Sequence, residues 1–220
     1  DHNVALGVSA LTTNTKANKN IAIGSNTLST FNVTSDTDTY NTAVGYGAGA
    51  TVTTGLSNTL IGGLAGDAIT TGSNNVGLGR SALTANTTAS DNTAVGMASL
   101  AANTTGANNT AVGRDALTLN TTGTQNVALG SISLDANTTG SENTAVGYGS
   151  LSANTTAAGN TAMGWYSMFA TTTGYANVAV GLSALGAQTT GYENVALGHQ
   201  ALDALTTGSL NTAVGRAAGG

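Results

Sequence analysis

The chain has 220 residues and a net charge of −5, with only 7% charged residues, 31 Gly, no Pro and no Cys. Its five Lys and Arg residues, scattered from Lys16 to Arg216, exclude the clustered basic surface of a nucleic-acid-binding protein. The lack of Cys excludes disulfide frameworks and thiolate metal sites. No apolar run approaches the ~18 residues that cross a bilayer. We therefore expect no nucleic-acid partner and no membrane insertion by this segment.

An internal repeat organises nearly the whole chain. Its pattern is Asn-[Thr/Val/Ile]-Ala-[Val/Leu/Ile/Met]-Gly-x-x-[Ala/Ser]-Leu-x-x-Asn-Thr-Thr-Gly-x-x, and its positions are numbered 1 to 17 from the first Asn. Successive units begin seventeen positions apart, except that the step from Asn20 to Asn41 is four positions longer. The thirteen units begin at Asn3, Asn20, Asn41, Asn58, Asn75, Asn92, Asn109, Asn126, Asn143, Asn160, Asn177, Asn194 and Asn211. A repeat of this length indicates a solenoid, in which each unit stacks on the next.

Short strands are expected in each unit. Asn, Thr and Gly are poor helix formers, whereas Thr and Val favour strands. The first strand of each unit occupies positions 2 to 4, which are residues 4–6, 21–23, 42–44, 59–61, 76–78, 93–95, 110–112, 127–129, 144–146, 161–163, 178–180, 195–197 and 212–214. A second strand is expected near positions 12 to 14, with Gly at positions 5 and 15 marking corners.

The predicted fold class is all-β, a parallel β-solenoid (β-roll) of thirteen 17-residue coils. Residues 1–220 form a single β-solenoid repeat domain, with a four-residue insertion within 31–40. Solenoid ends need polar caps, and the chain stops midway through a coil at Gly219 and Gly220. We therefore expect a fragment of a longer fibre.

Alternation along the first strand predicts which side chains share a face. Positions 2 and 4, such as Val127 and Leu129, are expected to point into the core of the coil. Position 3 then points outward, although it is Ala in eleven of thirteen units. A sheet that is apolar on both faces is normally covered on both. The Ala column therefore predicts packing against another chain.

Other columns of the repeat indicate the core. Position 9 is usually Leu, as at Leu117, and supplies a core residue. Gly49 and Gly66 replace that Leu where Val52 and Ile69 replace the Asn at position 12, which predicts an exchange of volume within a close-packed coil. The invariant Asn at position 1 is expected to form a hydrogen-bonded ladder. The invariant Gly at position 5 indicates a positive φ or a close backbone contact.

The residues offer little for catalysis or for a cofactor. Catalysis needs a nucleophile, acid or base beside an orienting partner, and the two His residues, His2 and His199, lie in the first and twelfth units. Asp36 and Asp38 in the insertion suggest calcium, but few other carboxylates are near to complete a shell of six to eight oxygens. We expect no enzyme activity, no metal site and no cofactor. The glycosylation sequons of the Asn-Thr-Thr corners, such as Asn86 and Asn137, are expected to be by-products of turn chemistry.

The most variable column of the repeat is position 6, directly after the invariant Gly, and variation within a strict repeat predicts that this column faces outward. It carries Tyr148 and Trp165 in adjacent units, and Tyr166 follows at position 7. Tyr175 and Tyr192 lie at position 16 of the next units. Exposed aromatic side chains suit sugar faces or protein contacts. We predict a receptor- or glycan-binding patch formed by Tyr148, Trp165, Tyr166, Tyr175 and Tyr192. The insertion between Phe31 and Tyr40 is a second candidate.

The core of the repeat resembles two groups of fibrous proteins. Asn-Thr-Ala-Val-Gly-x-x-Ala, as in residues 109–116, is similar to the head repeat of trimeric autotransporter adhesins. The longer form with Asn-Thr-Thr-Gly, as in residues 137–140, resembles repeats of phage tail-fibre proteins. The resemblance implies an extracellular homotrimer, on a bacterial cell surface or a virion tail fibre, that attaches to a host-surface protein or glycan. The repeat unit of this chain is longer than the adhesin head unit.

The Thr-Thr pairs allow an alternative function. Ten successive units carry Thr-Thr in register, from Thr53 and Thr54 to Thr206 and Thr207. Flat Thr arrays order ice-like water, so an ice-binding β-solenoid is the alternative. Adjacent residues of a strand face opposite ways, which leaves one Thr column rather than two.

Overall fold

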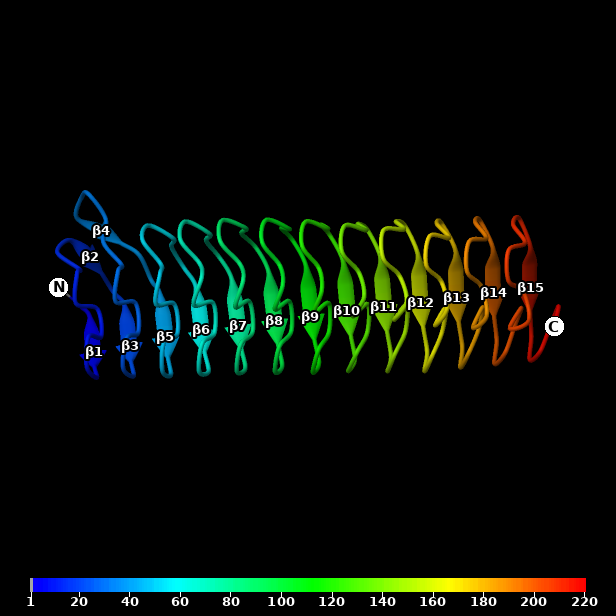
Figure 1. The fold of residues 1–220 in the computed structure, drawn as a ribbon, viewed down its shortest axis with the longest axis horizontal. Helices are drawn as coiled ribbons and strands as arrows, with labels where there is room; N and C mark the ends of the chain where they lie inside the picture. The colour runs from blue at the N-terminus through cyan, green and yellow to red at the C-terminus, as the bar shows by residue number, and fades with distance from the viewer. Residues whose placement is uncertain (1) are drawn as a thin grey trace. The chain divides into compact units, whose positions relative to one another are not determined.

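The computed structural model describes residues 2–220 and divides them into two compact units, the first ending at Asn108 and the second spanning Asn109–Gly220. Each unit is a stack of coils that contributes one short strand per coil to a parallel sheet (Figure 1). Corresponding residues of successive coils pair in register, as in Val127 with Thr144 and Ala128 with Ala145. The predicted parallel β-solenoid is therefore confirmed. Residues 2–220 contain no helix that is long and apolar enough to span a membrane.

All the predicted first strands form within the predicted bounds. Unit 1 contains β1 (Val4–Leu6), β3 (Ile21–Ile23), β5 (Thr42–Val44), β6 (Thr59–Ile61), β7 (Val76–Leu78) and β8 (Thr93–Val95). Unit 2 contains β9 (Thr110–Val112), β10 (Val127–Leu129), β11 (Thr144–Val146), β12 (Thr161–Met163), β13 (Val178–Val180), β14 (Val195–Leu197) and β15 (Thr212–Val214). A column hereafter means one position of the repeat followed through the coils of a unit.

The second strand predicted near positions 12 to 14 does not form in residues 2–220. The N–H groups of Thr53 and Thr54 both donate to the carbonyl oxygen of Thr70, at 2.9 and 3.2 Å. Two successive donors that converge on one acceptor cannot continue an evenly spaced ladder. The chain therefore bends at this point, and the prediction of a second strand is wrong.

The inner and outer faces of the sheet are the reverse of the prediction. Ala111 and Ala128 in column 3 are completely buried, whereas Val112 and Leu129 in column 4 are 37% and 38% exposed. The Ala column therefore lines the interior of its own coil and cannot be the surface that meets another chain. Ala is required because the Leu of column 9, such as Leu117, is also buried in the same interior.

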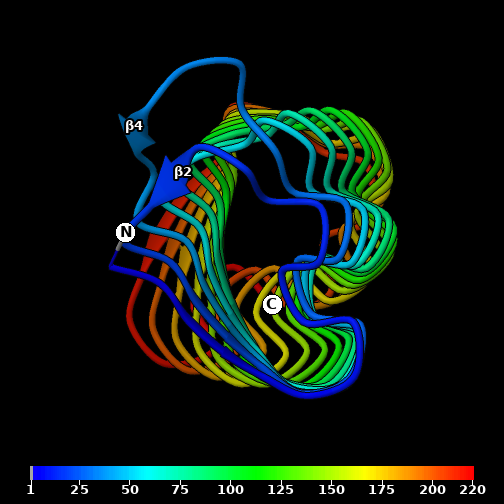
Figure 2. The ribbon, with the colours of Figure 1, turned by 90° about the vertical axis from the view of Figure 1, so that its left-hand side faces the viewer.

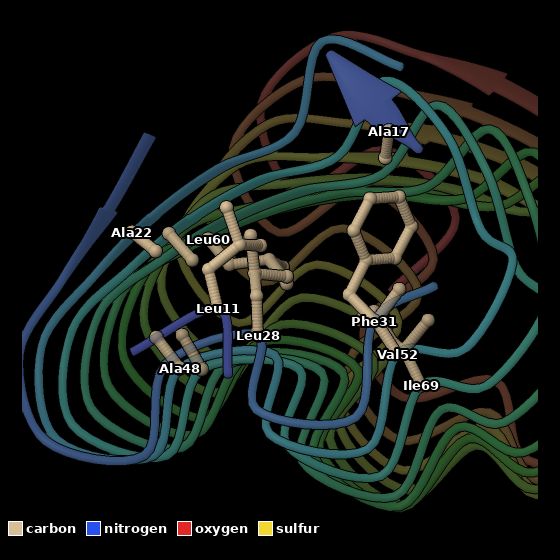
Figure 3. Close-up of a cluster of buried hydrophobic side chains, with 11 residues drawn as sticks. Leu11, Ala17, Ala22, Leu28, Phe31, Ala48, Val52, Leu60 and Ile69 are labelled. Atoms are coloured by element: carbon tan, nitrogen blue, oxygen red, sulfur yellow. The ribbon is translucent and has the colours of Figure 1, made fainter. Parts of the chain in front are cut away.

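The core of unit 1 shows how columns 3, 9 and 12 share the interior (Figure 3). Leu60 is the one large residue in column 3, and a Cβ added to Gly66 would lie 2.7 Å from its Cδ2 and 2.7 Å from the Cδ1 of Ile69. A Cβ added to Gly49 would lie 3.0 Å from Leu60 and 3.3 Å from Val52. The predicted exchange of volume between columns 9 and 12 is confirmed, and Leu60 is its third participant.

The buried Leu residues of column 9 have an unfavourable backbone conformation. Leu100, Leu117 and Leu134 have φ values of 50°, 51° and 50°, in the left-handed region. This conformation costs an L-residue about 1–2 kcal/mol. Complete burial of a Leu side chain contributes about 1.5–3 kcal/mol, so packing offsets the backbone cost in each coil.

The invariant Asn of column 1 forms the predicted ladder. The side chain of Asn143 is buried, and its Oδ1 accepts the backbone N–H of Asn160 at 3.0 Å. Its Nδ2 donates to Oδ1 of Asn126 at 3.2 Å and, across the coil, to the carbonyl oxygen of Ala157 at 2.8 Å. Each Asn therefore connects two coils and also joins the two ends of its own coil.

A second, less regular ladder runs along column 12. Nδ2 of Asn137 donates to Oδ1 of Asn120 at 2.8 Å, and Nδ2 of Asn154 donates to Oδ1 of Asn137 at 2.9 Å. The ladder stops where Thr171 replaces Asn, and Oδ1 of Asn154 is left buried without a donor. These Asn side chains belong to glycosylation sequons, but their complete burial leaves no room for a glycan.

The insertion leaves the coil, as predicted. Its strand β4 (Thr37–Asp38) pairs in parallel with β2 (Ala17–Asn18) of the preceding coil. Figure 2 shows the loop around β4 outside the outline of the adjacent coils of unit 1. Phe31 does not leave with it and is completely buried. The expelled part therefore begins after Phe31.

Candidate functional site

Column 6 of unit 2 presents large side chains to solvent. Column 5 is always Gly, so the chain changes direction there and the next residue leaves the sheet. Tyr148 and Trp165 in column 6 are 42% and 51% exposed, and Leu182 in the next coil is 40% exposed. The predicted outward direction of this column is confirmed.

Four rings around Tyr166 form what we call the aromatic cluster: Tyr148, Trp165, Tyr166 and Phe169. The centroid of the Tyr166 ring lies 4.5 Å from Trp165, 4.7 Å from Phe169 and 5.5 Å from Tyr148. The contacts with Phe169 and Tyr148 are edge-to-face, with interplanar angles of 70° and 74°. These geometries are favourable for aromatic pairs, so each ring helps to fix its neighbours.

A small residue in the preceding coil makes room for the central ring. A Cβ added to Gly149, which precedes Tyr166 in column 7, would lie 2.6 Å from Cδ1 of the Tyr166 ring. Burial of the Tyr166 hydroxyl raises its pKa, and the neighbouring Tyr148 raises this pKa further. Tyr166 is half-buried, whereas Trp165 is exposed.

Tyr175 and Tyr192 form a separate pair in column 16. Their ring centroids are 5.1 Å apart with an interplanar angle of 4°, and the rings are 47% and 37% exposed. The ring contacts in residues 2–220 do not connect this pair with the aromatic cluster. By ring contacts, the five predicted site residues therefore fall into the aromatic cluster and this pair.

Phe169 is a member of the cluster that the sequence did not predict. It occupies column 10 of the coil that also carries Trp165 and Tyr166, and it is 43% exposed. The available signal is the concentration of large residues in columns 6, 7 and 10 of a single coil. That signal does not place column 10 next to columns 6 and 7, because the repeat alone does not show where its turns bring residues together.

An ion pair joins the insertion to the preceding coil. Nζ of Lys19 lies 2.6 Å from Oδ2 of Asp38 and 3.2 Å from the hydroxyl of Tyr40. The hydrogen bond to Asp38 raises the pKa of Lys19, and the same bond lowers the pKa of Asp38. Residues 2–220 contain no group of three or more His, Asp or Glu that could hold a metal ion.

The two Thr columns differ in their accessibility. In column 13 the hydroxyl of Thr138 donates to the carbonyl oxygen of Thr155 at 3.0 Å, and Thr121 and Thr189 make the same bond to their next coils. Column 14 is exposed, as Thr122 and Thr139 show. One Thr column is therefore engaged in the scaffold and one faces water.

The outer face of the unit 2 sheet carries an apolar stripe. In column 4 the exposed fractions lie between 37% and 42% for Val112, Leu129, Met163, Val180 and Leu197. The half-buried Thr and Val residues of column 2, such as Val127 and Thr144, share this face. The stripe is the outer surface of a parallel sheet whose inner face is fully packed.

No known protein family, curated protein or solved structure matches this chain. The likeness to adhesin heads and tail fibres therefore depends on the repeat residues alone, while the β-solenoid with 17-residue coils is established by the structure.

Proposed function

We propose that this chain is a structural and adhesive segment of an extracellular attachment fibre, on a bacterial cell surface or a virion tail fibre. It acts by binding rather than by catalysis. The observation that carries the proposal is the aromatic cluster, which places exposed rings on one part of a regular scaffold. The other coils hold that surface at a distance from the rest of the fibre.

The cluster is suited to recognition because its rings are already ordered. Trp165 is exposed but packed against Tyr166, so binding would cost it little side-chain entropy. A sugar ring or an apolar protein surface placed over Trp165 would be removed from water on one side. The resemblance to adhesins and tail fibres supports the same function independently.

The attachment test uses the double variant Trp165→Ala, Tyr166→Ala. We expect at least a tenfold loss of binding to host cells or to a glycan array, because about 1.4 kcal/mol of lost contact is a factor of ten. Tyr46→Ala is the matched control, since Tyr46 is a column 6 ring of unit 1 that is 62% exposed and makes no ring contact within residues 2–220. Unchanged attachment of the double variant would remove the cluster from the proposal.

Ice binding is the second candidate function, and the exposed Thr residues of column 14 favour it. The hydroxyls of column 13 are already donated to the scaffold, which leaves a single accessible column. Thermal hysteresis measured on the parent chain distinguishes the two functions. Clear hysteresis that is lost on replacing Thr122 and Thr139 by Val would favour ice binding over attachment.

The apolar stripe of column 4 supports assembly into a homotrimer. A parallel sheet is normally covered on both faces, and in unit 2 only the inner face is covered within the chain. The interface between copies is therefore assigned to columns 2 and 4 instead of to the Ala column. Host-surface proteins or glycans would contact the columns that remain outside this interface.

Assembly is tested by Leu129→Lys, with Leu119→Lys as the matched control. Both residues are exposed leucines of unit 2, 38% and 52% exposed, but Leu119 lies in column 11, away from the sheet. We expect Leu129→Lys to convert the trimer into folded monomers, because a charge would be buried without a partner. Sedimentation equilibrium gives the mass. A monomeric parent chain, or equal dissociation by Leu119→Lys, would contradict the assignment.

A further inference from the structure

Column 6 carries arginines and no acidic residues, whereas the two lysines, Lys16 and Lys19, lie in columns 14 and 17. All three arginines, Arg80, Arg114 and Arg216, occupy this column, and His199 does as well. None of the ten Asp and Glu residues does, although acidic residues outnumber Lys and Arg by ten to five. An exposed column that simply tolerated any polar residue would carry acids more often than arginines.

The acidic residues lie in other columns. Asp67, Asp135 and Asp203 occupy column 10, and Asp91, Glu142 and Glu193 occupy column 17. The three acids of the latter column are exposed in the same way as the arginines of column 6. Exposure alone therefore does not explain why column 6 carries arginines and His199 but no acidic residue.

Cationic residues of unit 2 flank the accessible rings along this column. From one coil to the next, the order is Arg114, Ser131, Tyr148, Trp165, Leu182, His199 and Arg216. Adjacent strands of a sheet are about 4.8 Å apart. Because each arginine lies three coils from Trp165, the distance along the stack is about 14 Å. This spacing suits an extended ligand better than a compact one.

Both guanidinium groups remain accessible. Nη1 of Arg114 lies 2.8 Å from Oδ2 of Asp115, but 58% of the Arg114 side chain is exposed. Arg216 is exposed and has no acidic partner within residues 2–220. A guanidinium presents five N–H donors in a planar fork that matches a carboxylate. One ion pair therefore leaves Arg114 with donors for a ligand.

We propose that the column 6 face of unit 2, formed by Arg114, Tyr148, Trp165, His199 and Arg216, binds an acidic polysaccharide. This inference depends on the proposed attachment function and specifies its ligand class. The sugar faces would stack on Tyr148 and Trp165, and the carboxylates would pair with Arg114 and Arg216. His199 would donate a hydrogen bond between the two. A neutral glycan would leave the arginines without a function.

The test compares the binding of oligogalacturonate with that of its carboxyl-reduced, neutral counterpart, using the full chain. We expect the parent chain to bind the acidic probe at least tenfold more tightly, with an affinity that falls as salt is raised. The double variant Arg114→Gln, Arg216→Gln should bind the acidic probe no better than the neutral one. Trp165→Ala should weaken the binding of both probes.

Arg80→Gln is the matched control, because Arg80 is the column 6 arginine of unit 1 and its Nη2 contacts Sδ of Met97. Equal losses from Arg80→Gln would indicate unspecific charge attraction and would overturn the proposal. Equal binding of both probes, still lost in Trp165→Ala, would overturn the acidic specificity and leave the attachment function intact. If the parent chain binds neither probe, the inference fails, while cell attachment that depends on Trp165 would preserve the attachment function.

Discussion

Replacing Gly130 by Ala is expected to lower the stability of unit 2 by at least about 3 kcal/mol. Gly130 occupies the invariant column 5, and its φ of 141° lies in a region that L-residues rarely adopt. An added Cβ would also lie 2.5 Å from the carbonyl oxygen of Gly147 in the next coil. Two independent causes therefore act at one position, and rotating the backbone to relieve one would break the parallel register.

Guanidinium denaturation followed by circular dichroism measures this effect, and Gly159→Ala is its control. Gly159 has a φ of 70°, and a Cβ there would have no atom nearer than 4.0 Å. Gly159→Ala therefore carries only the cost of placing an L-residue in the left-handed region, about 1–2 kcal/mol. If both variants lost the same stability, the contact between successive column 5 residues would not be the reason for the invariant Gly.

Replacing Asn143 by Leu is expected to cost about 3 kcal/mol. The change removes the acceptor of the Asn160 backbone N–H. Asn160 is completely buried, so water cannot replace that acceptor. An unsatisfied buried donor costs about 1–3 kcal/mol, and each lost hydrogen bond about 1 kcal/mol more. The same denaturation measurement would report the loss, since Leu has the same branched skeleton as Asn and leaves no cavity.

Asn137→Leu in column 12 is the corresponding control. Asn137 is equally buried and bonds to Asn120, Asn154 and the carbonyl of Gly140. It accepts no backbone N–H within residues 2–220, and the carbonyl oxygen of Gly140 keeps a second donor in Nδ2 of Asn126. No buried backbone group is therefore left unpaired, and we expect about half the cost. A larger loss for Asn137→Leu than for Asn143→Leu would contradict the assignment of column 1 as the principal ladder.

Much of the fold could be predicted because every coil repeats the same constraints. The invariance of column 1, compared with the substitutions in column 12, predicted the ladder that Asn143 forms. The Leu of column 9 was correctly placed in the core. Gly66 in column 9 and Ile69 in column 12 of the same coil correctly indicated that these two columns share one interior volume. Thirteen variants of one coil give information that a single non-repeating sequence does not contain.

Residue size alone could not show which face of the first strand points into the coil. Both faces are apolar, so alternation did not show which one is internal. The informative signal is Leu60, the only large residue in column 3, which coincides with Gly49 and Gly66 in column 9. Residues that exchange volume must share an interior. Leu60 and these two glycines together therefore place column 3 inside the coil.

The candidate site was only partly predictable for a different reason. Column 6 was recognised as exposed because it varies freely, and this identified Tyr148 and Trp165. The contact between Tyr166 and Phe169 depends on the shape of the turn through columns 7 to 10. The stacking of Tyr175 on Tyr192 depends on the path of the coil. Neither is contained in the spacing of the repeat.

The parallel register, which recurs every seventeen positions, also has a consequence for the gene. Every coil presents the same two edges, one to the preceding coil and the other to the next. Seventeen codons can therefore be duplicated or deleted while the adjoining register is kept. A change of another length must be absorbed outside the sheet, as the insertion that carries β4 shows. Recombination between copies of the repeat would therefore change the length of such a protein in whole coils, while point mutation changes its surface.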